Sequence, residues 1–141
     1  MTRIIADISV SLDGFVAGPD PSPDNGLGTG GEALHTWAFS DDPDDRRFLH
    51  EGTARSGAVV LGRHLFDVVD GPKGWDDTAG YGATIGSALD AGLVDALTLH
   101  LAPIVLGAGT PVFTGGAPRT VVQRSVISTS TATHLTYDVS R

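Results

Sequence analysis

The chain has 141 residues and a mass of 14.5 kDa, which is the size of one domain with a single core. Its formal net charge of −8 argues against a nucleic-acid partner, because phosphate binding depends on clustered lysine and arginine. The absence of cysteine excludes disulfides, cysteine-ligated zinc and a thiol nucleophile. No apolar run approaches the roughly 20 residues of a membrane helix, and no signal-peptide core follows the start. We therefore expect one cytoplasmic domain over residues 1–141, with neither a membrane nor a nucleic-acid partner.

The N-terminal part of the chain predicts a strand, a long loop and a short helix. Residues 3–11 are rich in β-branched side chains and predict an internal strand that ends before Asp13. Proline, glycine, aspartate and asparagine dominate residues 18–31, which is typical of a functional loop such as a lid. Residues 32–39 then predict a short helix with Leu34, Trp37 and Ala38 on an apolar side that packs inward.

The middle of the chain predicts a helix followed by a buried parallel strand. The aspartates at 41–45 lack the glycine and final glutamate of a calcium loop, so we interpret them as a helix cap. Residues 44–56 predict a helix with Phe48 and Leu49 toward the core. The apolar run 58–61 predicts an internal strand, and the glycine turn and helix start that follow it make a plausible anion site.

The C-terminal half predicts a helix, a long strand and a hairpin. Residues 83–91 predict a helix that ends at Gly92, and residues 96–106 predict an internal strand bent at Pro103. Residues 120–127 and 133–139 predict an antiparallel hairpin at a sheet edge. Together these elements predict an α/β fold with a mixed sheet, flanking helices and a C-terminal hairpin.

Candidate ligand-binding residues gather where parallel strands end, because ligands of open α/β sheets bind beyond those ends. Asp13, Arg63 and Gly82 all fall there. The Arg63 guanidinium could grip a phosphate or simply pair with a nearby acid. Asp13 could bond a substrate or only its own turn. The histidines show no zinc spacing, so no metal is expected, and His100 is interpreted as a hydrogen-bonded strand residue.

Three stretches of sequence resemble a known family. They are ISVSLDGFVAG at 8–18, VVLGRHLFD at 59–67, and the segment from GLVD at 92–95 through LHLAPIVLGAG at 99–109. In order and wording they are similar to the dihydrofolate-reductase-like family, which includes the reductase domain of the bifunctional riboflavin-biosynthesis deaminase-reductases. The resemblance covers nearly the whole chain and implies a dihydrofolate-reductase-like sheet, NADPH as cofactor and a small-molecule substrate.

The resemblance also implies roles for particular residues. The residues implied to bind the cofactor are Val16 and Ala17 through their backbone, Gly62, Arg63 and His64 at the adenosine phosphate, and Gly82, Ala83 and Thr84 as the remains of a pyrophosphate turn. The residues implied to lie beside the substrate are Leu12, Asp13 and Gly107, with Asp13 as the candidate catalytic residue.

The middle of the chain departs from the family. Typical relatives place two strands and a helix between the segments that match residues 71–75 and 82–85, and few residues bridge them here. Two hypotheses follow: an NADPH-dependent reductase of a pyrimidine- or pterin-like heterocycle, imine or carbonyl, or a repurposed scaffold that binds a small molecule or catalyses without cofactor. A sheet that has lost central strands exposes an edge, which predicts a homodimer with a pocket between its subunits.

Overall fold

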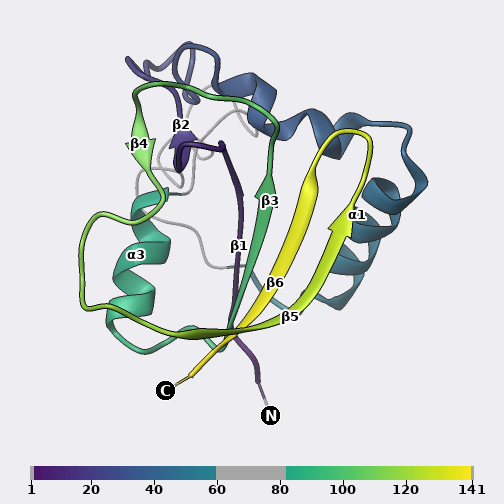
Figure 1. Ribbon diagram of the computed structural model, residues 1–141, viewed down its shortest axis with the longest axis vertical. Helices are drawn as coiled ribbons and strands as arrows, with labels where there is room; N and C mark the ends of the chain where they lie inside the picture. The colour runs from purple at the N-terminus through teal and green to yellow at the C-terminus, as the bar shows by residue number, and fades with distance from the viewer. Residues whose placement is uncertain (1, 60–81, 141) are drawn as a thin grey trace.

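The structure is a computed structural model that describes residues 2–59 and 82–140. Its described elements follow the chain as strands β1 (Ile5–Val10) and β2 (Phe15–Ala17), the 3-10 helix η1 (Gly31–Phe39), helices α1 (Pro43–Arg55) and α3 (Gly82–Asp90), and strands β3 (Ala96–Leu101), β4 (Thr110–Pro111), β5 (Val121–Ser128) and β6 (Thr133–Val139) (Figure 1).

The main sheet is mixed and has the strand order β1-β3-β6-β5 in the described part of the chain. Strands β1 and β3 are parallel, with Ile5 opposite Ala96 and Val10 opposite Leu101. Strand β6 runs antiparallel to β3 and forms the C-terminal hairpin with β5. The predicted α/β class, mixed sheet and terminal hairpin are therefore confirmed.

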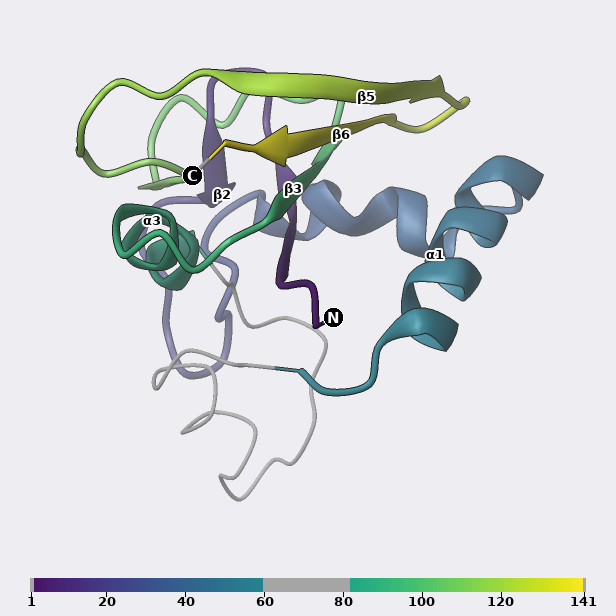
Figure 2. The same cartoon turned by 90° about the horizontal axis from the view of Figure 1, so that it is seen from below.

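The two faces of the sheet differ in chemistry because side chains alternate along each strand. One face carries the apolar core, in which α3 packs Ile85 and Leu89 against β1. The opposite face is polar where β1, β3 and β6 meet, and η1 and α1 cover it. Helices α3 and α1 consequently lie on opposite sides of the molecule (Figure 2).

The loop between β2 and η1 is folded back on itself. The Gly18 amide donates to the Leu27 carbonyl at 2.7 Å, and the Thr29 amide donates to the Pro19 carbonyl at 2.8 Å. The Leu27 side chain is buried. The segment expected to form a lid is thus a closed loop packed on the rest of the fold.

The short helix expected at 32–39 is present as η1, and its burial pattern explains its type. Gly31, Leu34 and Trp37 are its buried residues. A spacing of three residues places them on one side of a 3-10 helix, which has three residues per turn. The expected inward position is confirmed for Leu34 and Trp37, whereas Ala38 is only half-buried and the buried Gly31 was not predicted.

Helix α1 begins and ends close to the expected positions, but its inward face is partly polar. The Asp42 carboxylate caps the helix by accepting from the Asp44 amide at 2.9 Å, and Pro43 occupies the first turn. Phe48 is half-buried, as expected, whereas Leu49 is exposed, which corrects the prediction for that residue. Asp45 takes the most buried position on the helix because a hydrogen-bond partner for its carboxylate, His134, lies on the sheet.

Two strand predictions need correction. Strand β3 ends at Leu101 rather than at 106, because Pro103 lacks an amide hydrogen and cannot extend the ladder. Ala58 and Val59 are not in a strand, and the rest of the expected strand at 58–61 lies outside the described residues. Among the described residues β1 pairs only with β3, so its expected internal position stays a prediction.

Candidate functional site

The carboxyl ends of β1 and β3 meet in a hydrogen-bonded pair of loops. After β1, the chain turns at Ser11, whose hydroxyl accepts from the Phe15 amide at 2.9 Å and donates to Asp13 Oδ1 at 2.6 Å. The Leu12 amide donates to the Ile104 carbonyl at 2.9 Å and ties this turn to the loop after β3. This is the edge at which open α/β sheets bind ligands.

Asp13 joins the two loops through its carboxylate. Oδ2 accepts from the Gly107 amide at 2.7 Å, and Oδ1 accepts from the Leu106 amide at 3.1 Å. The Ser11 hydroxyl bond and these backbone donors lower the pKa of Asp13, so it is an ionised acceptor at neutral pH. The structure therefore shows Asp13 holding local structure, while its expected contact with a substrate stays a prediction.

Leu12, Asp13 and Gly107 lie together, as the prediction of a shared substrate site requires. Leu12 is 59% exposed. It lines a small cavity of about 150 Å³. The other residues of the cavity wall are Leu101, Pro103 and the turn between β5 and β6, Thr129 to Thr133. The hairpin turn thus contributes to the same edge as the β1 turn.

The segment after the β1 turn is packed too closely for side-chain contact with a cofactor. Val16 belongs to the apolar core and Ala17 is buried. Gly109 has φ 138°. A Cβ added there would lie 2.0 Å from the Ala17 carbonyl oxygen. The side chains of Val16 and Ala17 are therefore not available to a cofactor, and the contact through their backbone that the resemblance implies stays a prediction.

The remaining cofactor residues fall at the start of α3 or outside the described residues. Gly82, Ala83 and Thr84 form the first turn of α3. Gly62, Arg63 and His64 lie outside the described residues, so the expected phosphate contacts stay predictions.

A second polar cluster lies between the sheet and helices η1 and α1, and only part of it was expected. His100 Nε2 contacts Asp7 Oδ1, His100 Nδ1 contacts His134 Nδ1, and His134 Nε2 contacts Asp45 Oδ1, each at 2.7 Å. We call these four residues the histidine chain. Its inner members His134 and Asp45 are completely buried, whereas the Asp7 side chain is 52% exposed.

Two aromatic rings enclose the histidine pair. Trp37 stacks on His100 with ring centroids 4.0 Å apart and donates its indole N–H to the Ser9 hydroxyl at 2.9 Å. Phe48 stacks on His134 with centroids 4.7 Å apart. Helix η1 thus shields His100 from water through Trp37, and helix α1 shields His134 through Phe48.

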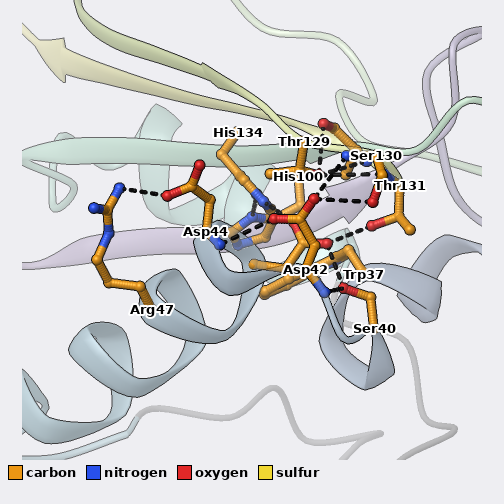
Figure 3. Close-up of polar contacts among 12 residues, drawn as sticks. Trp37, Ser40, Asp42, Asp44, Arg47, His100, Thr129, Ser130, Thr131 and His134 are labelled. Atoms are coloured by element: carbon orange, nitrogen blue, oxygen red, sulfur yellow. Dashed lines mark hydrogen bonds and ion pairs between the residues drawn. The ribbon is translucent and has the colours of Figure 1, made fainter.

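Asp45 anchors the buried end of the chain. Its Oδ2 accepts from the hydroxyls of Ser40 and Thr131. Although burial opposes its ionisation, the hydrogen bonds from Ser40, Thr131 and His134 lower its pKa to about 2. The neighbouring Asp42 binds the backbone amide and hydroxyl of Ser130, so two aspartates of the α1 start hold the hairpin turn (Figure 3).

The sequence analysis identified His100 as a hydrogen-bonded strand residue, which is confirmed, but missed its partners. Asp7 interrupts the apolar strand β1, His134 lies in β6 opposite His100, and Asp45 follows the helix cap by three residues. Those polar interruptions were the available signal. Within the described residues no cluster of side chains has the form of a metal site, and no helix there is long and apolar enough to cross a membrane.

Comparison with known proteins finds similarity to the RibD C-terminal domain over part of the chain. Residues 78–137 match the family model of the RibD C-terminal domain. No curated protein matches the sequence significantly.

Three solved structures that align with this chain differ in how closely they match it. A protein from Shewanella sp. PV-4, described as a candidate riboflavin biosynthesis protein, aligns with TM-score 0.55 and 19% identity over 99% of this chain and 100% of its own. RibD of Acinetobacter baumannii aligns with TM-score 0.39 and 23% identity over 42% of this chain and 19% of its own. A pyrimidine reductase-like protein of Corynebacterium diphtheriae aligns with TM-score 0.40 and 18% identity over 72% and 47%.

The last two scores are too low to indicate a common fold, so the Shewanella structure carries the fold comparison. It shows that the fold of this chain is that of the Shewanella protein. Residues 78–137 are accordingly related to the RibD C-terminal domain, and the chain has the fold of a RibD-like, dihydrofolate-reductase-like protein.

Proposed function

We propose that this protein is an NADPH-dependent reductase of a small heterocyclic, imine or carbonyl substrate. The observation that carries the proposal is the edge formed by the turns after β1 and β3, where Leu12, Asp13 and Gly107 converge within a RibD-like fold. A pyrimidine- or pterin-like ring is the substrate class that the family resemblance favours.

The described residues fit a nicotinamide nucleotide in part. Gly14 and Gly107 have positive φ angles, and a Cβ added at either would meet no atom within 4 Å, so their backbone is open to a ligand at this edge. Helix α3 starts with a glycine, as a pyrophosphate turn requires. The cation for the 2'-phosphate is Arg63 in the proposal, and Arg63 lies outside the described residues.

The chain's own residues would bind and orient the reactants. A bound NADPH would supply the hydride. The ionised Asp13 carboxylate would accept a hydrogen bond from a substrate N–H or O–H at the β1 turn, and its bonds to the Leu106 and Gly107 amides would hold it in place. Because the pKa of Asp13 is lowered, its role is to position the substrate rather than to donate a proton.

Calorimetric titration of the purified protein with NADPH and NADH tests the proposal. We expect NADPH to bind more tightly than NADH, because an arginine fork recognises the 2'-phosphate. Arg63→Ala should weaken NADPH binding by about 1.5–3 kcal/mol, the range for a charge-assisted hydrogen bond. It should also reduce the preference over NADH.

Arg46→Ala is the matched control, since it removes the same charge from an exposed side chain on α1 that is paired with Asp41. It should leave both affinities unchanged. Absence of NADPH binding by the wild-type protein would refute the proposal and favour the alternative scaffold with a small-molecule site.

We also propose that the protein is a cytoplasmic homodimer. Exposed apolar residues support the dimer, among them Ile5 on β1 and Val122 and Val126 on the edge strand β5. Light scattering at micromolar concentration should give twice the mass of 14.5 kDa. A monomer would contradict the dimer without bearing on the cofactor.

A further inference from the structure

The histidine chain has three hydrogen bonds, whereas two neutral histidines supply protons for only two. Its three contacts, Asp7 to His100, His100 to His134 and His134 to Asp45, are each 2.7 Å long. Each needs one proton, because two lone pairs repel at that distance. A neutral imidazole carries a single N–H, so the two rings supply two protons when both are neutral. The geometry requires a third.

The third proton does not belong to Asp45. Hydrogen bonds from Ser40, Thr131 and His134 outweigh burial and lower the pKa of this carboxylate to about 2, which keeps it ionised at neutral pH. At the other end of the chain Asp7 is half exposed, so water also solvates its charge. The third proton is therefore carried by one of the two imidazoles.

His134 is the neutral member of the pair. Burial lowers its pKa, and repulsion from His100 adds to this, while the hydrogen bond and charge of Asp45 act in the opposite direction. As a neutral ring it donates Nε2–H to Asp45 and accepts at Nδ1. His100 then carries both protons and donates Nδ1–H to His134 and Nε2–H to Asp7.

The surroundings of His100 suit a cation. The Asp7 carboxylate lies against its Nε2, and the Trp37 ring stacks on it at 4.0 Å with an interplanar angle of 27°, which is a favourable cation–π arrangement. Among the described residues the charged groups that act on the pair are Asp7 of β1 and Asp45 of α1. Helix η1 contributes the uncharged Trp37, and Phe48 of α1 covers His134.

We propose that the His100–His134 pair is a proton-binding site that retains one excess proton at neutral pH and thereby latches α1 and the hairpin turn onto the sheet. The proposal does not depend on the reductase function. It assigns a ligand, the proton, to buried residues that no nucleotide would contact.

Loss of the excess proton would open the latch. With only two protons for three contacts, the lone pairs of the two Nδ1 atoms would point at each other across 2.7 Å. The stacked Trp37 and Phe48 rings restrict rotation of the imidazoles out of this arrangement. A displacement of His134 would also act on Asp45, which is bonded to His134 Nε2 and to the Thr131 hydroxyl. Because Thr131 lines the small cavity with Leu12, the shape of that cavity would depend on the proton.

Nitrogen NMR of the histidine rings in the uniformly 15N-labelled full chain tests the proposal directly. At pH 7 we expect both nitrogens of His100 to be protonated and His134 to be the Nε2–H tautomer. As the pH rises, the ring signals of both residues and the backbone amides of residues 129–132 should change together, with one shared midpoint. His50, which is exposed on α1 and lies outside the histidine chain, is the internal control for signals that should not share this change.

Asp7→Asn separates the latch from simple packing. It keeps an oxygen acceptor for His100 Nε2 but removes the compensating charge, so the shared midpoint should fall by about 1 pH unit, the low end of the range for an adjacent opposite charge because Asp7 is half exposed. Asp41→Asn removes the same charge from an exposed pair outside the chain and should not move it. Two neutral histidines at pH 7, or equal midpoints in the two variants, would overturn the proposal.

Discussion

The replacement Asp45→Asn should destabilise the protein by an amount that depends on pH. Asp45 is completely buried as an ionised carboxylate, with hydrogen bonds from Ser40, Thr131 and His134. Asparagine has the same size but no charge, and its amide nitrogen cannot accept the hydrogen bonds that the second carboxylate oxygen accepted. The variant therefore removes what the ionised form contributes to folding.

The magnitude follows from the lowered pKa. At 1.36 kcal/mol per pH unit, the difference between the ordinary 3.8 and about 2 corresponds to about 2.4 kcal/mol of stability at neutral pH. Because the folded-state pKa is the lower one, this stability is fully present above pH 3.8 and is lost as the pH falls toward 2. The deficit of the variant should shrink to about 1.3 kcal/mol at pH 3 and nearly disappear by pH 2.

Urea unfolding followed by circular dichroism at 25 °C measures the deficit at each pH. Asp44→Asn is the matched control. It removes the same charge at the position next to Asp45, where the carboxylate is exposed and pairs with Arg47 at 3.0 Å. Its cost should stay below about 1 kcal/mol. A deficit of Asp45→Asn that equals the control at pH 7, or that does not change between pH 7 and pH 2, would refute the account of Asp45 as an ionised anchor.

Three further substitutions test the packing by urea unfolding. Gly109→Ala should cost more than about 2 kcal/mol of stability, because φ is 138° and the new Cβ would meet the Ala17 carbonyl oxygen. The control Gly57→Ala places its Cβ in open space and should be nearly neutral. Similar costs for both variants would contradict the close approach at Gly109. Gly52→Ala, in α1 with no atom near the new Cβ, should stabilise by about 0.5–1 kcal/mol, and a loss of stability would be inconsistent with the helix. Leu34→Ala should cost about 2–5 kcal/mol of stability, because the Leu34 side chain is completely buried. The control Leu49→Ala removes an exposed side chain and should cost less than about 0.5 kcal/mol. Equal costs would mean that the inward face of η1 is assigned wrongly.

The sequence predicted the described elements well where local signals determine them. Gly92, with φ 67°, ends α3 one turn after Leu89, and its amide donates to the Leu89 carbonyl at 3.0 Å. The β-branched runs of the C-terminal hairpin needed no long-range information either. Leu49 was misplaced because an apolar residue in an amphipathic pattern was assumed to face the core, whereas α1 covers a polar sheet face.

The candidate site was predicted unevenly for a related reason. Leu12, Asp13 and Gly107 were expected together because topology brings the ends of parallel strands to one edge. The histidine chain joins residues separated by 93, 34 and 89 positions, and no local pattern indicates which polar interruptions of different strands will meet. Only the register, which sets His134 opposite His100 and His100 opposite Ser9, aligns them on one face.

The two polar regions of the fold have separate chemical requirements but share structural elements. Strand β1 carries Asp7 of the histidine chain and continues into the turn that holds Asp13. The hairpin turn is bound to α1 through Asp42 and Asp45, and it also lines the cavity beside Leu12. A change in the protonation of the buried pair would therefore reach the ligand edge through Thr131, without any contact between the histidines and a ligand. If ligand affinity proves to depend on pH with the midpoint of the histidine pair, the dependence should persist in a variant of Asp13, because Asp13 lies outside the chain that titrates.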